Sequence, residues 1–411
     1  MPKPDAISAM ERALACPDPA DAIAQLDPLI AGADPAVAAV ARINRHVLAT
    51  LQARREALAA RPTPGERIVE QWDRGADAAT PPVASVIMPT YNRDPAVLRD
   101  SVQSALRQDL VTHELIVVND GGERTAAEAV LRPMHEADPR LRYIVAQHGG
   151  SASALNVGLH AARGRIIAYL DDDDRYHPHH LATACDALGD DDDGTAVLTQ
   201  FAHVVMQRDG DGDGDMREWR ETSRAVRYRA TRAARGDYRW RMHAPNRGPI
   251  VHHRALLDRI GGGFCELVRY AEDWEFALRI SRTAGFTGVD VVTGEFISRR
   301  GSQQKTKVRG ADMVEDWNLI LAHHGIHPLS GPVLHGRRGA QLGRVLADAL
   351  EWHPDVIRAL ELRVLLHAPP WKLLRELGKL YRNLGDAVVA RRAFAVARQL
   401  MPLFHPRRWL A

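Results

Sequence analysis

Residues 156–178, NVGLHAARGRIIAYLDDDDRYHP, decide the fold of this chain. A helical pattern leads into a short apolar run, residues 166–170, which ends in four consecutive aspartates, residues 171–174. A continuous apolar run bounded by glycine and charge predicts a strand buried on both faces, as in a parallel sheet. Acidic side chains directly after such a strand lie at the carboxyl edge of the sheet, where ligands of open α/β folds bind.

The aspartate run has two interpretations. Successive strand side chains point to opposite faces, so Asp171 and Asp173 can point the same way and hold a hard divalent cation against a substrate phosphate. A solvated acidic turn, with Asp174 capping a helix that begins near Pro178, explains the same residues without a ligand. The run alone does not decide between the two.

The composition is that of a globular protein with room for two or three domains. The chain has 411 residues, of which 45% are hydrophobic and 26% charged, and its net charge is +2. This charge balance gives no field that would attract nucleic acid. Three scattered cysteines make neither a disulfide framework nor a metal cluster, which suits a reducing compartment. Because the sequence shows neither a signal-peptide core nor a run of about 20 apolar residues, we expect a cytoplasmic protein.

The spacing of apolar residues divides the chain into three regions. Residues 1–82 show helical spacing and end in a linker, which predicts a helical N-terminal extension. Residues 83–306 alternate strands and helices, which predicts right-handed crossovers and a mainly parallel sheet in an α/β fold. Residues 307–411 are again helical. They contain one tetratricopeptide-like hairpin at about 371–404, which must pack on its neighbours because one repeat cannot bury its own face.

Polar residues follow several of the predicted strands. The loops after the first, second and fourth strands share one edge of a parallel sheet, and they carry Thr90, Asp120 and Asp171. We therefore expect a common cleft at this edge. Glu272 and Asp273 open a later helix, where they either complement the helix N-terminus or supply a general base at the mouth of the cleft.

Three further segments have both a plain and a functional explanation. The loop SRRGSQQKTKVRG, residues 298–310, is either ordinary basic surface or a clamp for a diphosphate. The run DGDGDGD, residues 209–215, resembles a calcium loop, but Arg220 stands where a bidentate glutamate belongs, so we favour a solvated loop. The end MPLFHPRRWLA, residues 401–411, is either a packed tail, which we favour, or a peripheral contact with an anionic membrane. The terminal helices are where a protein partner would bind.

Six motifs in this order resemble family 2 of the nucleotide-sugar glycosyltransferases, which are inverting enzymes with the GT-A fold. The motifs are VIMPTYNR at 86–93, VVNDGG at 117–122, GGSASALNVG at 149–158, AYLDDDDRYHP at 168–178, GGFCELVRYAEDWEFALR at 262–279 and RRGSQ at 299–303. Each motif alone is weak, but six in order make a strong resemblance over about residues 83–306. The resemblance implies a Rossmann-like, mainly parallel sheet flanked by helices, with helical N- and C-terminal extensions.

The resemblance also implies roles for single residues. Asp171 and Asp173 would hold Mg²⁺ or Mn²⁺ against the diphosphate. Asp273 would be the catalytic base, with Glu272 and Trp274 on the acceptor side. The residues implied to bind the nucleotide sugar are Thr90, Asn92, Arg93, Asp120, Gly150, Asn156, Asp171, Asp172, Arg299 and Arg300. Two departures from the family pattern obscure the donor identity: Leu155, where many members have arginine, and Arg300-Gly301, where many have a histidine-containing loop.

The reaction that the resemblance implies is the metal-dependent transfer of a sugar from a nucleoside diphosphate to an acceptor hydroxyl, with inversion. UDP is the carrier we favour, with GDP and dTDP sugars left open. The acceptor would be a carbohydrate, a lipid-linked group or a protein, in cell-surface polysaccharide or glycoconjugate synthesis.

Three other interpretations stay open at this point. A nucleotidyltransferase acting on sugar phosphates would need a glycine-rich phosphate loop, which PTYNRD at 89–94 lacks. A phosphatase with an aspartate nucleophile usually has its acidic motif after the first strand, whereas here the motif follows the fourth. The third alternative is a non-catalytic helical scaffold with a degenerate core.

Overall fold

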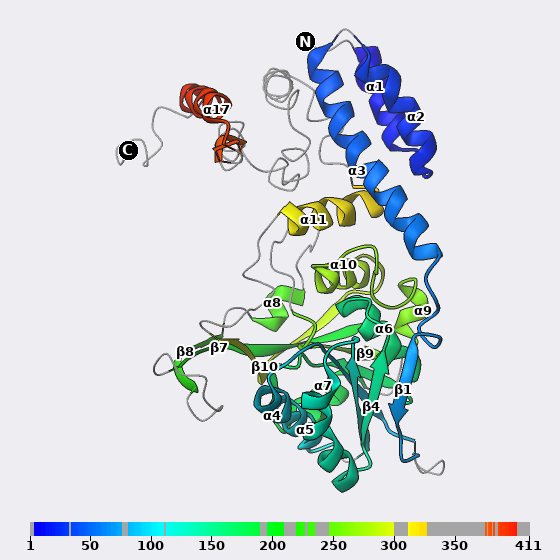
Figure 1. The fold of residues 1–411 in the computed structure, drawn as a ribbon, viewed down its shortest axis with the longest axis vertical. Helices are drawn as coiled ribbons and strands as arrows, with labels where there is room; N and C mark the ends of the chain where they lie inside the picture. The colour runs from blue at the N-terminus through cyan, green and yellow to red at the C-terminus, as the bar shows by residue number, and fades with distance from the viewer. Residues whose placement is uncertain are drawn as a thin grey trace. The chain divides into compact units, whose positions relative to one another are not determined.

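The computed structural model describes residues 4–32, 34–75, 81–110, 112–189, 195–208, 219–226, 229–234, 246–299, 311–326, 375, 377–379, 381–382 and 385–400. The chain forms two compact units, one from residues 1–60 and 308–411 and the other from residues 61–307 (Figure 1). The DGDGDGD run, residues 300–310 of the basic loop and the tail 401–411 lie outside the described residues.

Among the described residues, ten strands form one sheet in the unit 61–307. Its order is β1-β4-β3-β2-β5-β9-β7-β10-β6, with β8 paired to β7. The strands are β1 Ile68–Trp72, β2 Ala84–Thr90, β3 His113–Asn119, β4 Leu141–Ala146, β5 Ile166–Tyr169, β6 Arg175–Tyr176, β7 Ala196–Arg208, β8 Trp219–Val226, β9 Ile250–His253 and β10 Phe286–Arg299.

The centre of the sheet is parallel, as the alternation of strands and helices predicted. β4, β3, β2 and β5 run side by side in one direction, and every residue of these four strands is buried. The helices between and after them are α4 Pro95–Leu106, α5 Arg124–Ala137, α6 Ser151–Ala161 and α7 His180–Leu188. The predicted α/β fold, with a largely parallel sheet flanked by helices, is confirmed. The carboxyl ends of β2, β3 and β5 therefore meet at one edge.

Apolar layers cover both faces of this sheet (Figure 1). On one face lie α6, α9 (Leu256–Arg259) and α10 (Glu272–Thr283), which pack on residues such as Ile87, Val118 and Tyr169. On the other face, α4, α5 and α7 pack on the alternate strand residues, among them Val86 and Met88. Because the layers clamp the strands from both sides, the loops at the carboxyl edge start from fixed points.

Four strands of the sheet, β1, β6, β8 and β9, run antiparallel to their neighbours. β9 runs antiparallel to both β5 and β7, so its beginning lies at the edge where β5 ends.

β1 runs antiparallel to β4 at the border of the sheet. β1 lies within residues 1–82, so the expectation of a helical extension is wrong for residues 68–72. Half-buried and exposed residues alternate along β1, and Trp72 packs on Tyr143 with ring centroids 4.6 Å apart. Five residues of period two are too short to stand out beside a long helical pattern.

The described helices of the other unit are α1 Pro4–Leu14, α2 Pro19–Ile30, α3 Pro35–Ala59, α11 Ala311–His323 and α17 Ala387–Leu400. α1 and α2 pack on α3. α11 is tied to α3 by Arg54, which pairs with Glu315 at 2.9 Å and with the fully buried Asp316 at 2.6 Å. In the part of the chain that the structure describes, no helix has both the length and the apolarity that a membrane crossing requires.

The described part of the predicted tetratricopeptide-like hairpin brings its two segments into contact. Leu377 and Tyr381 are buried, as are Ala390 and Ala397 of α17. A Cβ atom at Gly378 would lie 2.9 Å from the ring of Phe394, so this glycine permits the close approach. The packing agrees with a hairpin that buries its inner face, while the repeat assignment itself stays a prediction.

The sheet contains a buried ion pair at the edge opposite the aspartate run. Glu114 of β3 accepts from Arg142 at 2.8 Å and from Ser85 at 2.6 Å, and the Glu114 and Arg142 side chains are each 6% exposed. Without the Glu114 charge, the buried Arg142 keeps, among the described residues, only its longer ion pair with Asp73, at 3.2 Å. We therefore expect Glu114→Gln to lower the free energy of unfolding by about 3 kcal/mol in urea titrations. Glu70→Gln, which removes a solvent-exposed partner of Arg124, is the control and should change stability little. Equal, small effects of both substitutions would contradict this account of the core.

Candidate functional site

Thr90 joins the loops that follow β2, β3 and β5. Its carbonyl oxygen accepts from the backbone N–H of Asp120 at 3.0 Å, and its hydroxyl donates to the Asp172 carboxylate at 2.7 Å. Thr90, Asp120 and Asp172 are all buried. The three loops therefore meet at the predicted edge.

Arg93 lies against the aspartate run. It donates to Asp172 at 2.9 Å, and its guanidinium lies 3.1 Å from the Asp173 carboxylate. Arg299 of β10 donates to the Asp173 carbonyl oxygen at 2.8 Å. Two cationic side chains from distant parts of the sequence thus contact the aspartate run.

The fourth aspartate has a structural contact. The buried Asp174 carboxylate accepts from the backbone N–H of Ile297 at 2.8 Å and so holds β10 beside the run. The N-cap of α7 is His179, which makes no capping hydrogen bond with its side chain. The alternative in which Asp174 caps the next helix is therefore wrong: its carboxylate binds a strand instead.

Arg247 is a site residue that the sequence analysis missed. One of its guanidinium nitrogens donates to Asp171, and another donates to Glu272 at 2.8 Å. Its side chain is 12% exposed. Burial works to lower the pKa of Arg247, but the negative charges of Asp171, Glu272 and Asp273 outweigh it and raise this pKa above its usual value. The residue stays charged and connects the aspartate run to α10.

The start of α10 places Glu272 and Asp273 at this edge. Ala271, just before the helix, has a φ of 60° in the left-handed region, so the chain turns sharply there. Asp273 accepts from the backbone N–H of Trp274 at 2.7 Å. The Trp274 side chain is buried, so its ring belongs to the packing of α10 rather than to an open surface.

Burial and like charge perturb two of the carboxyl groups. Burial raises the pKa of Asp273 to about 7, with Glu272 adding to the shift and Arg247 opposing it. Burial raises the pKa of Asp173 to about 6, where Arg93 opposes the shift and the neighbouring Asp172 and Asp171 add to it. The carboxylates here outnumber the guanidinium groups of Arg93, Arg247 and Arg299. Hard oxygen donors with excess negative charge fit a divalent cation such as Mg²⁺ or Mn²⁺.

A glycine turn binds the carboxylate of Asp120. The N–H groups of Gly149 and Gly150 donate to its two oxygens at 2.9 and 2.8 Å. Gly150 has a φ of 91°, a conformation that side chains rarely permit. Asn92, with a φ of 49°, accepts from the Glu123 N–H at 2.6 Å and shapes the adjoining loop.

One predicted residue, Asn156, stands apart from this cluster. Asn156 was expected to shape the nucleotide pocket, but its side chain donates to the carbonyl of Phe264 at 2.9 Å and accepts from its N–H at 2.8 Å. It therefore anchors the segment before α10. Arg300 lies outside the described residues.

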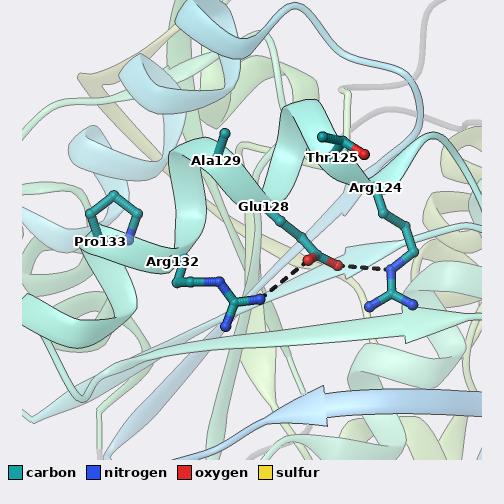
Figure 2. Close-up of a pocket in the computed structure, with 6 residues that line it drawn as sticks. All are labelled: Arg124, Thr125, Glu128, Ala129, Arg132 and Pro133. Atoms are coloured by element: carbon teal, nitrogen blue, oxygen red, sulfur yellow. Dashed lines mark hydrogen bonds and ion pairs between the residues drawn. The ribbon is translucent and has the colours of Figure 1, made fainter.

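Figure 2 shows a separate hollow on the surface of α5. It is lined by Arg124, Thr125, Glu128, Ala129, Arg132 and Pro133. Glu128 pairs there with Arg124 at 2.7 Å and with Arg132 at 3.3 Å (Figure 2). The predicted site residues are not among those that line it, and its charged side chains pair with one another and with Glu70 of β1, so the aspartate run is the better candidate.

Comparison with known proteins identifies the family. Residues 85–239 match the family described as Glycosyl transferase family 2. The chain carries a family 2 glycosyltransferase domain. The family and the enzyme class predicted from the six motifs are thereby confirmed. Because the match ends at residue 239, it is the structure that brings Arg247, Asp273 and Arg299 to the edge.

Several curated relatives are similar over part of their length. The uncharacterized glycosyltransferase EpsJ of Bacillus subtilis is 40% identical over 93 residues, which are 23% of this chain and 26% of the relative. The chondroitin synthase of Pasteurella multocida is 28% identical over 209 residues, 50% of this chain and 19% of the synthase. The chain thus spans about a quarter or less of these two relatives.

Solved structures are similar at low sequence identity. Residues 1–349 of TarS from S. aureus, in complex with UDP-GlcNAc, align with a TM-score of 0.48 at 17% identity, over 77% of this chain and 91% of that chain. The mannosyltransferase PcManGT from Pyrobaculum calidifontis, in complex with GDP-Man and Mn²⁺, aligns with a TM-score of 0.42 at 20% identity, over 90% of this chain and 98% of that chain.

The perturbed carboxyl group of Asp273 can be titrated directly. With ¹³C-labelled aspartate, we expect its carboxyl signal, assigned by its loss in Asp273→Asn, to titrate near pH 7. Arg247→Ala should move this titration to higher pH, because the guanidinium charge lowers the pKa. A titration near the ordinary aspartate value of about 4 would contradict the buried placement of Asp273.

Proposed function

We propose that residues 83–306 transfer a sugar from a nucleoside diphosphate to an acceptor hydroxyl, by a single displacement that inverts the anomeric carbon. One observation carries this proposal: Arg247 connects Asp171, which follows β5, to Glu272, which lies beside Asp273 on α10. The proposed metal ligand Asp171 and the candidate base thus lie close to each other although they are distant in sequence. The family match supports the reaction class.

The donor would bind along the carboxyl edge. Asp120 uses its two oxygens for backbone N–H groups, and a carboxylate has about four lone-pair sites, so it can also accept from a base N–H. Tyr91, which is exposed, offers an aromatic face beside His148, with ring centroids 5.0 Å apart, and His148 lies 3.0 Å from the Asp120 carboxylate. Thr90, Asn92 and Gly150 shape this pocket, and we favour UDP as the carrier.

The diphosphate would meet the cations of the site. As the bond to the sugar breaks, negative charge grows on the leaving phosphate, and preorganised positive groups stabilise that charge. Arg93, Arg299 and Arg300 are the residues that we assign to this role. Asp171 and Asp173 would hold Mg²⁺ or Mn²⁺, with Asp172 beside them, and the ion would supply further positive charge to the diphosphate.

Asp273 would take the proton from the acceptor hydroxyl. A pKa of about 7 makes its carboxylate a stronger base than an ordinary aspartate, yet one that is largely ionised slightly above neutral pH. Activity should therefore fall as the pH drops below about 7, because the protonated acid cannot accept a proton. Glu272 contributes by raising this pKa, and Arg247 keeps the pair in place.

The acceptor we propose is a hydroxyl of a carbohydrate, a lipid-linked group or a protein. A chondroitin synthase is similar to half of this chain, which supports a role in polysaccharide or glycoconjugate synthesis. The family match also disfavours a nucleotidyltransferase or an aspartate-nucleophile phosphatase.

Release of nucleoside diphosphate from a panel of nucleotide sugars, with Mn²⁺ and with candidate acceptors, tests this proposal. Asp273→Asn should lower kcat by about 10²–10⁴-fold while donor binding is retained, because only the base is lost. Asp258→Asn, the same substitution at an exposed position of α9, is the matched control and should behave as the wild type. Full transfer activity in Asp273→Asn, or no diphosphate release from any donor, would refute the assignment.

A further inference from the structure

A buried ion pair lies outside the family-matched residues 85–239 and outside the cluster of site residues. Arg67 stands just before β1, and Glu266 stands in the segment before α10. The Arg67 guanidinium contacts both carboxylate oxygens of Glu266, at 2.9 and 2.8 Å. Their side chains are 8% and 6% exposed. Burying two charges is costly unless further hydrogen bonds satisfy them, so the surroundings of the pair indicate what it holds together.

Both partners make such further hydrogen bonds. Arg67 also donates to the carbonyl of Pro62 and to the hydroxyl of Ser153, each at 2.7 Å. Glu266 also accepts from Arg61 at 3.0 Å and from Asn156 at 2.8 Å. The pair therefore joins residues 61–67, helix α6 and the segment before α10.

On the donor side, the pair supports the glycine turn that binds Asp120. The carbonyl of Arg67 accepts from the N–H of Gln147 at 2.9 Å, which fixes the chain just before the turn. Ser153, held by Arg67, packs so closely on Gly149 that a Cβ atom there would lie 2.3 Å from its hydroxyl oxygen. The N–H groups of Gly149 and Gly150 bind Asp120. A movement of Ser153 would therefore displace the groups that bind Asp120.

On the acceptor side, the pair supports the helix that carries Asp273. Asn156 binds Glu266 and also both backbone groups of Phe264. The Phe264 ring stacks on Phe276 of α10 with centroids 4.4 Å apart. Arg279 of α10 donates to the carbonyl of Gly262 at 2.9 Å. The segment before α10 is thus attached to α10 through Gly262 and Phe264, and to Arg67 through Glu266.

We infer that Arg67 and Glu266 are a positioning pair, which holds the Asp120 turn and the first turn of α10 at a constant separation. Its catalytic consequence rests on the proposed function. The pair touches neither substrate nor reacting atoms and acts through the Gly149–Gly150 turn and through α10. Because a displacement of about 1 Å between reacting groups can cost about 10²-fold in rate, such a support affects donor binding and turnover together.

Hydrogen exchange and kinetics of single variants test this inference. Arg67→Ala and Glu266→Gln should each accelerate amide exchange in both residues 147–153 and residues 262–273. Each should raise the donor KM and lower kcat, with kcat/KM reduced about 10–100-fold. The double variant should lose little more than the worse single variant, because both substitutions break the same pair.

A milder variant and a matched control make the test decisive. Arg67→Lys keeps the charge but offers one nitrogen, whereas Arg67 uses one nitrogen for Glu266 and Ser153 and another for Pro62. It should therefore accelerate exchange in the same two segments even where Arg67→Ala fails to fold. Glu70→Gln, at an exposed ion pair of β1, should match the wild type. Faster exchange confined to the segment that carries the substitution, or unchanged donor KM and kcat in a folded variant, would overturn the inference. If the wild-type protein transfers no sugar, the proposed function is wrong. The exchange measurement would still decide whether the pair couples residues 147–153 to residues 262–273.

Discussion

The contact of the Arg247 guanidinium with Asp171 and Glu272 is the interaction on which the site depends. It holds together carboxylates that the fold brings into a largely buried place, where water screens them poorly. Two like charges about 4 Å apart cost on the order of 4 kcal/mol at the effective dielectric of a protein surface, so this cluster needs internal cations. Arg93 and Arg299 supply two more at the aspartate run. The remaining excess of negative charge would draw a divalent cation to this edge. The bound ion, together with Arg93 and Arg299, would then offer positive charge to a diphosphate.

The same burial and repulsion of charges also perturb the candidate base. Burial together with Glu272 raises the pKa of Asp273 to about 7, which turns a weak base into a useful one. The carboxylates of this cluster repel one another, so they need a rigid support that keeps them from moving apart. The fully buried strands β2 to β5 provide it on one side. On the other side α10 is held by Phe264, Arg279 and, through Asn156, by the Arg67–Glu266 pair.

Local sequence signals were sufficient for the centre of the fold and for the acids at its edge. The buried strands read as continuous apolar runs, and the position of Asp120 and Asp171 follows from the rule that parallel strands end together. Arg247 could not be found in this way, because its place depends on β9 running antiparallel between β5 and β7, which long-range pairing decides. Asn156 shows a second limit: a motif gives the residue type, but whether its side chain faces the pocket or the segment at Phe264 depends on packing from outside the motif.

The central claim is that the carboxylates after β5 form a site for a metal ion and a nucleoside diphosphate, beside the candidate base on α10. A crystal structure of the protein grown with Mn²⁺ and UDP, with the anomalous signal of manganese recorded, tests this most directly. The account predicts an anomalous peak about 2.0–2.5 Å from carboxylate oxygens of Asp171 or Asp173, with the diphosphate bound to the same ion. A diphosphate bound at this edge without a manganese peak, or manganese bound only elsewhere on the molecule, would contradict it.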